Sequence, residues 1–335
     1  MLFYHFSQKL HIKTNKALKK KPCGMMSRVG LPVINLSGDD LRPGGERWKT
    51  TGKKVREAVE EYGCFMAEYN GVSPELREQV FKALEQLFDL PVERKMKNKY
   101  EKPFNGYVGQ LRTLPLHESL GIDDATTFHG VHSFTNLMWP SGNHHFSATL
   151  HSFAKIAEAL DKMVTKMIFE SYGVEKYYDS HASSITYLLR VLKNKAPQSE
   201  NPSLCLVDHT DKSFTTMLYQ DHINGLEVKT KDGQWIKVEI SSPSNFIVIA
   251  GDAFKAWSNG RIESPTHKVM TRGNEDRYSV GMFGFSNGTV EVPKELVDQN
   301  HPLKYKPFNH IGLLRFFQSQ EGFNSKSPLK DYCAL

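Results

Sequence analysis

The sequence predicts a single α+β domain in which a helical N-terminal part is followed by a β-sandwich or jelly roll. In the first half of the 335-residue chain, apolar residues recur at helical spacing. After Ser180 the pattern changes to eight short apolar runs within about a hundred residues, which is typical of sandwiches and jelly rolls. Neither an internal repeat nor a clear linker separates the two patterns, so one domain is the simplest architecture.

The N-terminal half is expected to form one short strand and three helices. The apolar run Leu31–Leu36 ends at a Ser-Gly-Asp-Asp turn and predicts the strand. Apolar spacing predicts the helices, over residues 51–68, 73–90 and 146–172. Ser73 and Pro74 supply the N-cap and the first position of the second helix. Residues 99–146 are rich in Gly, Pro, His and aromatic residues without periodicity, so we expect an irregular functional loop there.

The strands of the C-terminal half are expected where apolar runs lie between turn residues. They fall near Ser184–Leu192, Leu204–His209, Phe214–Gln220, Gly225–Lys229, Gln234–Glu239, Phe246–Ala250, Thr266–Thr271 and Arg277–Ser286. The chain then divides into an N-terminal extension, a helical region, a strand-rich core and a C-terminal segment, at residues 1–28, 29–178, 180–288 and 289–335.

Composition restricts the class of protein. A 39% hydrophobic and 24% charged content is ordinary for a soluble globular protein. An integral membrane protein is excluded because no apolar run approaches the roughly 18 residues of a membrane helix. The four cysteines lie far apart and form no CxxC pair, which excludes a disulfide scaffold and a cysteine-based zinc site and favours a reducing compartment. We therefore expect a cytoplasmic protein, and a monomer.

The net charge of +6 belongs to the N-terminal extension. Residues 1–26 contain six lysines and no acid, so the rest of the chain carries 37 basic and 37 acidic residues. A nucleic-acid-binding protein usually has a basic face on its folded body, so we expect no nucleic-acid partner. Interruption by lysines excludes a secretory signal, and the lack of arginine disfavours an organelle transit peptide. We expect a disordered extension ahead of a second start at Met25 or Met26.

Potential metal ligands occur together in the strand-rich half. His209 and Asp211 are two residues apart, so both side chains point to the same face of an extended chain. Alone, such a pair can equally be an exposed histidine beside a turn aspartate. A third potential ligand, His267, opens a later predicted strand. Two histidines and one carboxylate form the facial triad of non-haem Fe(II) oxygenases, so His209, Asp211 and His267 are candidate metal ligands and catalytic residues.

A second pair with the same spacing, Arg277 and Ser279, follows in the next predicted strand. A guanidinium offers a planar pair of donors to a carboxylate, and a hydroxyl adds another hydrogen bond. This pair is therefore a candidate site for the distal carboxylate of a dicarboxylate co-substrate. Phe283 lies on the same face of that strand, where it either lines a substrate pocket or belongs to the core.

These motifs resemble those of the plant 2-oxoglutarate/Fe(II)-dependent dioxygenases, over roughly residues 30–325. The matching segments include Leu31–Leu36, Tyr62–Phe65, His209–Asp211, Gly251–Arg261, Thr266–Val269 and Arg277–Ser279. Within this superfamily, three segments are most similar to the AOP-like enzymes, the clade of the glucosinolate side-chain dioxygenases. They are Pro115–Asp123, Phe134–Pro140 and Gly225–Trp235.

The resemblance implies a double-stranded β-helix (jelly-roll) core with a helical N-terminal region. It implies that His209, Asp211 and His267 hold Fe(II), with O2 at an open position, and that Arg277 and Ser279 bind the C5 carboxylate of 2-oxoglutarate. Ascorbate is expected to support activity. The implied reaction is the oxidation of a small organic metabolite, by hydroxylation, desaturation or demethylation, with release of succinate and CO2.

One strand departs from the family pattern. Members often carry a tyrosine that helps to hold 2-oxoglutarate in the strand before a Pro-Gln pair, where this chain has Lys193 and Asn194. Tyr187 lies nearby but is not assigned that role. Asp252 is expected to be a turn residue rather than a ligand, because it follows a strand, and Trp257 is expected to be structural. The histidines of the irregular stretch have no spaced carboxylate and are expected in a pocket or on the surface: His129, His132, His144 and His145.

Two functional hypotheses follow, an oxidoreductase and a catalytically inactive, cupin-like small-molecule-binding protein on the same barrel. The complete triad together with Arg277 and Ser279 favours the enzyme, since a degenerate binder needs neither. The expected substrate is a plant specialised metabolite or a hormone such as an auxin or a gibberellin.

Overall fold

The fold is built on two facing β-sheets, and the computed structural model describes residues 30–198, 201–240 and 242–335. The strands of the large sheet are, in spatial order, β1 (Val33–Asn35), β2 (Cys64–Glu68), β9 (Asn245–Ala250), β6 (Thr215–Gln220), β11 (Arg277–Ser286), β4 (Ile185–Asn194) and β3 (His117–Asp123). Those of the small sheet are β5 (Ser203–His209), β10 (His267–Thr271), β7 (Leu226–Lys229) and β8 (Trp235–Lys237). All eight strands expected in the C-terminal half are present, and the prediction of a jelly roll is confirmed.

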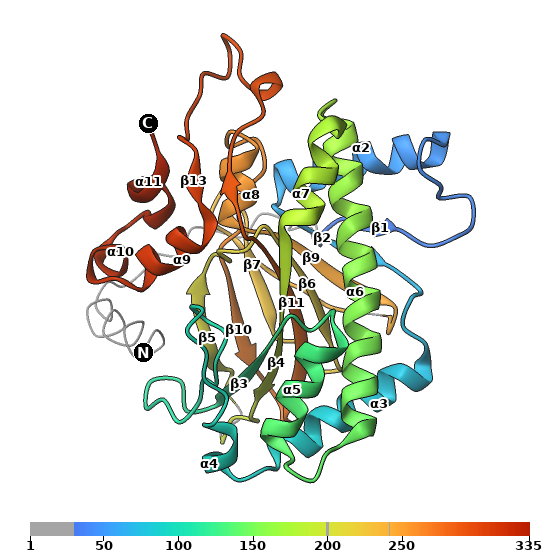
Figure 1. The fold of residues 1–335 in the computed structure, drawn as a ribbon, viewed down its shortest axis with the longest axis vertical. Helices are drawn as coiled ribbons and strands as arrows, with labels where there is room; N and C mark the ends of the chain where they lie inside the picture. The colour runs from blue at the N-terminus through green and yellow to red at the C-terminus, as the bar shows by residue number, and fades with distance from the viewer. Residues whose placement is uncertain (1–29, 199–200, 241) are drawn as a thin grey trace, which may run out of the picture.

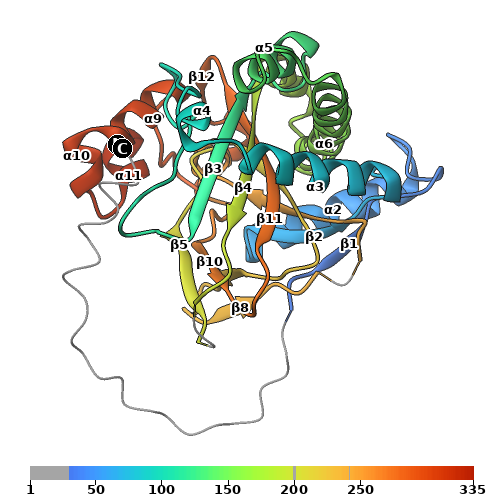
Figure 2. The ribbon, with the colours of Figure 1, turned by 90° about the horizontal axis from the view of Figure 1, so that it is seen from below.

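Helices cover the outer face of the large sheet, as Figure 1 shows, and the small sheet faces its other side (Figure 2). The helices of this layer are α2 (Glu46–Glu61), α3 (Pro74–Phe88), α5 (Phe128–Met138) and α6 (His144–Ser171). Between them and the sheet lies the main core, where Phe153 and Leu160 of α6 are buried with Val191 and Met217 of the sheet. Ser73 caps α3 as expected, because its side chain accepts a hydrogen bond from the Leu76 amide.

The predicted C-terminal boundary of the helix over residues 51–68 is wrong. The helix α2 stops at Glu61, and Gly63 adopts a left-handed conformation with φ +68°. A Cβ atom at Gly63 would lie 2.7 Å from the Glu263 carbonyl oxygen, so glycine is required there. Residues Cys64–Glu68 form β2, which is almost wholly buried between β1 and β9 and therefore has no alternation that would distinguish it from a helix.

The prediction of an irregular loop over residues 99–146 is also wrong in part. This stretch contains β3 at the edge of the large sheet and α5, and it is irregular in the segment before β3 and in the two short connections at residues 124–127 and 139–143. The pattern of β3 is hidden because six of its seven residues are buried and include His117, Glu118 and Ser119. The short helix α4 (Val92–Lys95) precedes this segment.

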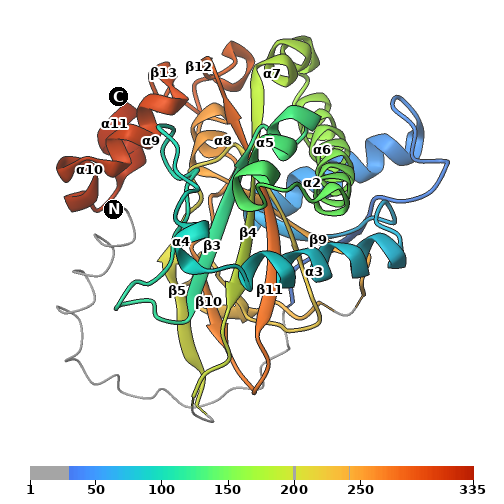
Figure 3. The ribbon, with the colours of Figure 1, turned by 60° about the horizontal axis from the view of Figure 1, so that its bottom comes forward.

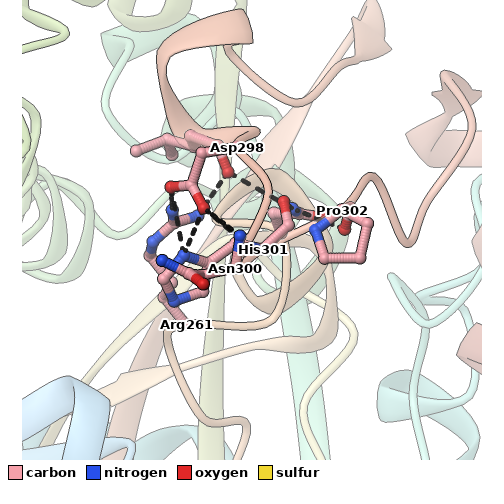
Figure 4. A network of polar contacts seen from close by, with 7 residues as sticks. Arg261, Asp298, Asn300, His301 and Pro302 are labelled. Carbon is pink, nitrogen blue, oxygen red and sulfur yellow. Dashed lines mark hydrogen bonds and ion pairs between the residues drawn. The ribbon is translucent and has the colours of Figure 1, made fainter.

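The C-terminal segment packs beside the open end of the two sheets, next to the segment that precedes β3 (Figure 3). After the hairpin of β12 (Thr289–Val290) and β13 (Phe308–Asn309) it forms α9 (His310–Gln318), α10 (Gln320–Asn324) and α11 (Pro328–Cys333). Polar contacts stabilise the loop between these two strands (Figure 4). The Asp298 carboxylate accepts hydrogen bonds from the amides of Asn300 and His301. Arg261, which lies in the segment after α8 (Asp252–Trp257), also donates to this carboxylate.

The predictions about membrane helices and about cysteines can be compared with the described residues. No helix there is both long and apolar enough to cross a membrane. Cys64, Cys205 and Cys333 are free and buried. Cys23 and the basic N-terminal extension lie outside the described residues.

Candidate functional site

The three candidate metal ligands converge between the two sheets. His209 ends β5 and His267 begins β10, and antiparallel pairing places these two residues directly opposite each other. Asp211 follows β5 and is 3.7 Å from the Nε2 atom of each histidine through its Oδ1 atom. One ligand atom from each of the three residues lies within 4.8 Å of the others. Two imidazoles and one carboxylate at this spacing form a donor set that suits Fe(II).

Hydrogen bonds orient each of these side chains toward the common centre. The Nδ1 atom of His209 donates to the Val207 carbonyl at 2.8 Å, and Nδ1 of His267 lies 3.2 Å from the Pro265 carbonyl. Both rings therefore present an Nε2 lone pair to the centre. Burial and the neighbouring His267 lower the pKa of His209 to about 4, which keeps its ring neutral at physiological pH.

Asp211 is oriented in the same way. Its Oδ2 atom accepts a hydrogen bond of 2.7 Å from the Thr216 hydroxyl, which leaves Oδ1 directed at the histidines. Ser213 contacts the same hydroxyl at 2.9 Å. Thr216 belongs to β6 of the large sheet, whereas Asp211 follows β5 of the small sheet. This hydrogen bond therefore connects the segment after β5 to the opposite sheet.

Arg277 lies at the beginning of β11 with only 1% of its surface exposed. Its Nη1 atom donates to Ser279 Oγ at 3.1 Å, its Nη2 to Gln220 Oε1 at 2.7 Å and its Nε to the Ile223 carbonyl at 3.1 Å. Within the described residues no carboxylate lies within 4 Å of its guanidinium. The structure thus brings Ser279 together with the buried Arg277 guanidinium, which has no carboxylate in direct contact among the described residues although the charge of Asp221 acts on it.

A pocket of about 680 Å³ opens beside the metal-ligand cluster. His209 and Asp211 line it, together with Phe283, so this phenylalanine faces the pocket rather than the main core. The irregular segment before β3 supplies Phe104 and Gly106, and α9 supplies Leu314. A predominantly apolar lining with a few convergent polar groups is typical of small-molecule sites.

The residues that sequence analysis set aside supply no ligand atom to this cluster, although the Asp252 amide donates to the Asp211 carbonyl at 2.8 Å. Tyr187 donates a 2.8 Å hydrogen bond to Asp161 on the helical side of the large sheet. Lys193 pairs with Asp276 at 3.1 Å, whereas Asn194 lies opposite Arg277 in the strand register. Asp252 pairs with Lys212 at 2.7 Å. Trp257 stacks on Phe169, and four histidines are exposed on α5 and α6: His129, His132, His144 and His145.

The structure also brings into the site residues that sequence analysis missed. Gln220 accepts a hydrogen bond from Arg277, and Thr216 donates one to Asp211. The pocket is also lined by Arg190, His117 and Ser119. For Arg190 a signal existed in the sequence, because a lone charge interrupts the apolar run of β4. The others carry no such signal, since their roles depend on which strands become neighbours.

Comparisons with known proteins agree with this geometry. The sequence profile of the 2OG-Fe(II) oxygenase superfamily matches residues 174–286, and the profile described as non-haem dioxygenase in morphine synthesis N-terminal matches residues 31–129. A protein of Arabidopsis thaliana named probable 2-oxoglutarate-dependent dioxygenase AOP1.2 is 43% identical over 91% of this chain and 96% of its own length. The chain belongs to the 2OG-Fe(II) oxygenase superfamily. The resemblance to the AOP-like clade is confirmed.

Solved structures of other members of the 2OG-Fe(II) oxygenase superfamily share the fold. The dioxygenase for auxin oxidation of rice is 29% identical, with a TM-score of 0.77 over 91% of this chain and 100% of that one. The corresponding enzyme of Arabidopsis thaliana, solved as a complex with 2-oxoglutarate, is 28% identical, with a TM-score of 0.73 over 81% of this chain and 99% of that one. This oxygenase is therefore an Fe(II)- and 2-oxoglutarate-dependent oxidoreductase that acts on a small molecule, and of the two hypotheses the enzyme is supported.

Proposed function

We propose that this oxygenase holds Fe(II) with His209, Asp211 and His267, binds the distal carboxylate of 2-oxoglutarate with Arg277 and Ser279, and oxidises a small organic metabolite in the pocket beside Phe283. The observation that carries the proposal is the convergence of three ligand atoms within 4.8 Å of one another at the edge of a pocket of about 680 Å³. When bound, the iron supplies the activation of O2 that is coupled to decarboxylation of 2-oxoglutarate to succinate.

The protein's own groups provide positions, charge and exclusion of water. Val207 and Pro265 orient the two imidazoles through their carbonyl groups, and Thr216 orients Asp211. The Arg277 guanidinium is enclosed between β6 and β11, so a carboxylate that reaches it is removed from water, where a charge-assisted hydrogen bond is strongest.

Substitution of the proposed ligands tests this assignment. The variants His209→Ala, Asp211→Ala and His267→Ala are each expected to abolish iron-dependent succinate release and to weaken Fe(II) binding, measured by equilibrium dialysis. The exposed His222 provides a matched control, and His222→Ala should behave like the parent protein. Full activity in any of the three ligand variants would contradict the assignment.

The substrate is proposed to be a plant specialised metabolite or a hormone, with hydroxylation, desaturation or demethylation as the outcome. The two solved relatives named for auxin oxidation support including auxins in the search. A screen of plant metabolites, scored by substrate-dependent succinate release and by mass change of the product, identifies both the substrate and the outcome.

We further propose that the oxygenase is a cytoplasmic monomer with neither a nucleic-acid nor a membrane partner, and that residues 1–26 are dispensable. The neutral charge balance of the remaining chain supports the last point. Light scattering tests the monomer, and a fluorescent fusion with and without residues 1–26 tests the location. The truncated protein should keep its melting temperature and its turnover, and a loss of either would show that the extension packs on the domain.

A further inference from the structure

Three cationic side chains are buried in the described part of the chain: Lys95, Arg190 and Arg277. Lys95 has a counter-charge, since its Nζ atom lies 2.8 Å from Glu118. Neither arginine has a carboxylate within 4 Å among the residues that the structure describes. Because an uncompensated buried charge is costly, each arginine indicates a place for an anion. The co-substrate accounts for Arg277, and Arg190 needs a separate explanation.

Arg190 points into the space between the sheets. It lies on the pocket-lining face of β4 with Leu188 and Leu192, two residues to either side. In the sheet register its neighbours are Gly281 of β11 and Gly121 of β3. Because both neighbours are glycines, no side chain from the two adjacent strands covers the guanidinium at this position. Arg190 therefore forms part of the pocket wall.

The existing contacts of Arg190 are all with neutral acceptors. Its Nη1 atom donates to the carbonyl groups of Phe104 and Gly106, the latter at 3.3 Å, and its Nη2 donates to Ser119 Oγ at 2.6 Å. A guanidinium carries five N–H groups, so these three bonds leave donors available to a ligand. Burial lowers the pKa of Arg190 to about 10, which still leaves the side chain charged at neutral pH.

The polar residues around Arg190 do not neutralise it. His117 lies 3.2 Å from Ser119 through Nε2, and burial together with the charge of Arg190 lowers the pKa of His117 to about 4, so its ring is neutral. The nearby Asp123 is engaged by Lys102 at 2.7 Å, and Glu118 is engaged by Lys95. The pocket wall therefore carries a net positive charge at Arg190.

We propose that Arg190 is the substrate-binding cation of this oxygenase, and that the substrate is an organic carboxylate. Its carboxylate pairs with Arg190 beside Ser119, and its apolar skeleton lies against Leu188, Phe283 and Phe285, which direct it toward the metal centre. This inference rests on the proposed function, because it assigns the large pocket to the oxidised substrate and Arg277 to the co-substrate.

A matched acid and amide pair tests the proposal without knowledge of the natural substrate. Binding of 1-naphthaleneacetate and of 1-naphthaleneacetamide is measured by calorimetry on the full chain loaded with Mn(II) and 2-oxoglutarate in the absence of oxygen. The acid should bind at least tenfold more tightly than the amide. In Arg190→Gln the acid should lose roughly 30-fold to several thousand-fold in affinity, whereas the amide should change little. Arg190→Lys should restore part of the preference for the acid.

Two controls separate this site from its surroundings. Lys99 lines the same pocket but is exposed, so Lys99→Gln should leave the acid preference intact. Circular dichroism and 2-oxoglutarate binding should be unchanged in Arg190→Gln, which distinguishes loss of this site from misfolding. An equal affinity for acid and amide in the parent protein, or an unchanged acid preference in Arg190→Gln, would overturn the proposal. Failure of the parent protein to bind Mn(II) and 2-oxoglutarate would instead overturn the proposed function.

Discussion

At the scale of single residues, the proposed co-substrate site contains a buried cation, Arg277, with no carboxylate in direct contact among the described residues. Arg277 is fixed by Gln220, Ser279 and the Ile223 carbonyl, all of which are neutral. Burial lowers its pKa from the ordinary value of arginine by more than the charge of Asp221 raises it. A dicarboxylate that reaches this guanidinium would therefore supply the directly paired carboxylate that the described residues lack.

Removal of this guanidinium should affect the co-substrate and leave the metal bound. Arg277→Ala is expected to raise the half-saturating 2-oxoglutarate concentration roughly 30-fold to several thousand-fold, because a desolvated carboxylate loses its partner. Arg277→Lys should recover part of this loss, and Ser279→Ala should cost only about 1–2 kcal/mol. Steady-state kinetics measure the effect, and Fe(II) dialysis provides the control. An unchanged 2-oxoglutarate requirement in Arg277→Ala would rule out this role.

Thr216 and Thr215 offer a neighbouring pair with opposite roles. The Thr216 hydroxyl orients Asp211, whereas the Thr215 hydroxyl donates to Asp161 on the other face of β6. Thr216→Val should weaken Fe(II) binding roughly 10- to 100-fold, as is typical when the partner of a metal ligand is lost. Thr215→Val should lower the free energy of unfolding but leave Fe(II) affinity unchanged. Equal Fe(II) affinities in the two variants would show that Thr216 does not position Asp211.

At the scale of elements, the sequence indicates a strand or a helix where a local pattern is bounded by turn residues. The strands of the C-terminal half are such bounded apolar runs, even where every residue is buried as in β9, and α3 and α6 show a helical stripe. β2 and β3 lack a bounded apolar run, because only Tyr62 and Gly63 separate β2 from α2 and because β3 begins with His117, Glu118 and Ser119. The candidate ligands could be predicted from the short spacing of His209 and Asp211. By contrast, Arg190, His117 and Gln220 lie on separate strands and reach the site only because β6, β11, β4 and β3 are neighbours in the sheet.

The packing of β3 against the irregular segment makes Gly121 intolerant of a side chain. A Cβ atom there would lie 2.1 Å from the Asn105 carbonyl oxygen, next to the carbonyl groups that bind Arg190. Gly121→Ala should therefore displace this segment and cost about 1–3 kcal/mol of stability, measured by urea unfolding. Gly284→Ala on β11 is the control, since its nearest neighbours lie at 3.4 Å, an ordinary contact distance. Similar unfolding free energies for the two variants would contradict this account.

At the scale of the whole molecule, neutral histidines packed against interior groups link stability to pH. Burial lowers the pKa of His181 to about 3 and that of His310 to about 4. His310 connects α9 to the sheets, because its Nδ1 atom accepts from the Ser286 amide and its Nε2 donates to the Lys212 carbonyl. His181 packs between aromatic rings, 4.2 Å from Phe214 and 5.0 Å from Phe169 between ring centroids. Protonation of either ring is therefore unfavourable in the folded state.

His181→Phe should make the protein less sensitive to acid. An unfolded histidine titrates near pH 6.5, so below that pH the unfolded state binds a proton that folded His181 does not take up until about pH 3. The stabilising effect of this difference is fully present above pH 6.5 and is lost as the pH falls, by up to about 1.4 kcal/mol per unit. The variant removes this loss, so its unfolding free energy, measured by urea unfolding, should fall less steeply from pH 6.5 to about pH 5. The exposed His145→Phe is the control, and an identical slope in His181→Phe and the parent protein would show that His181 does not contribute to acid sensitivity.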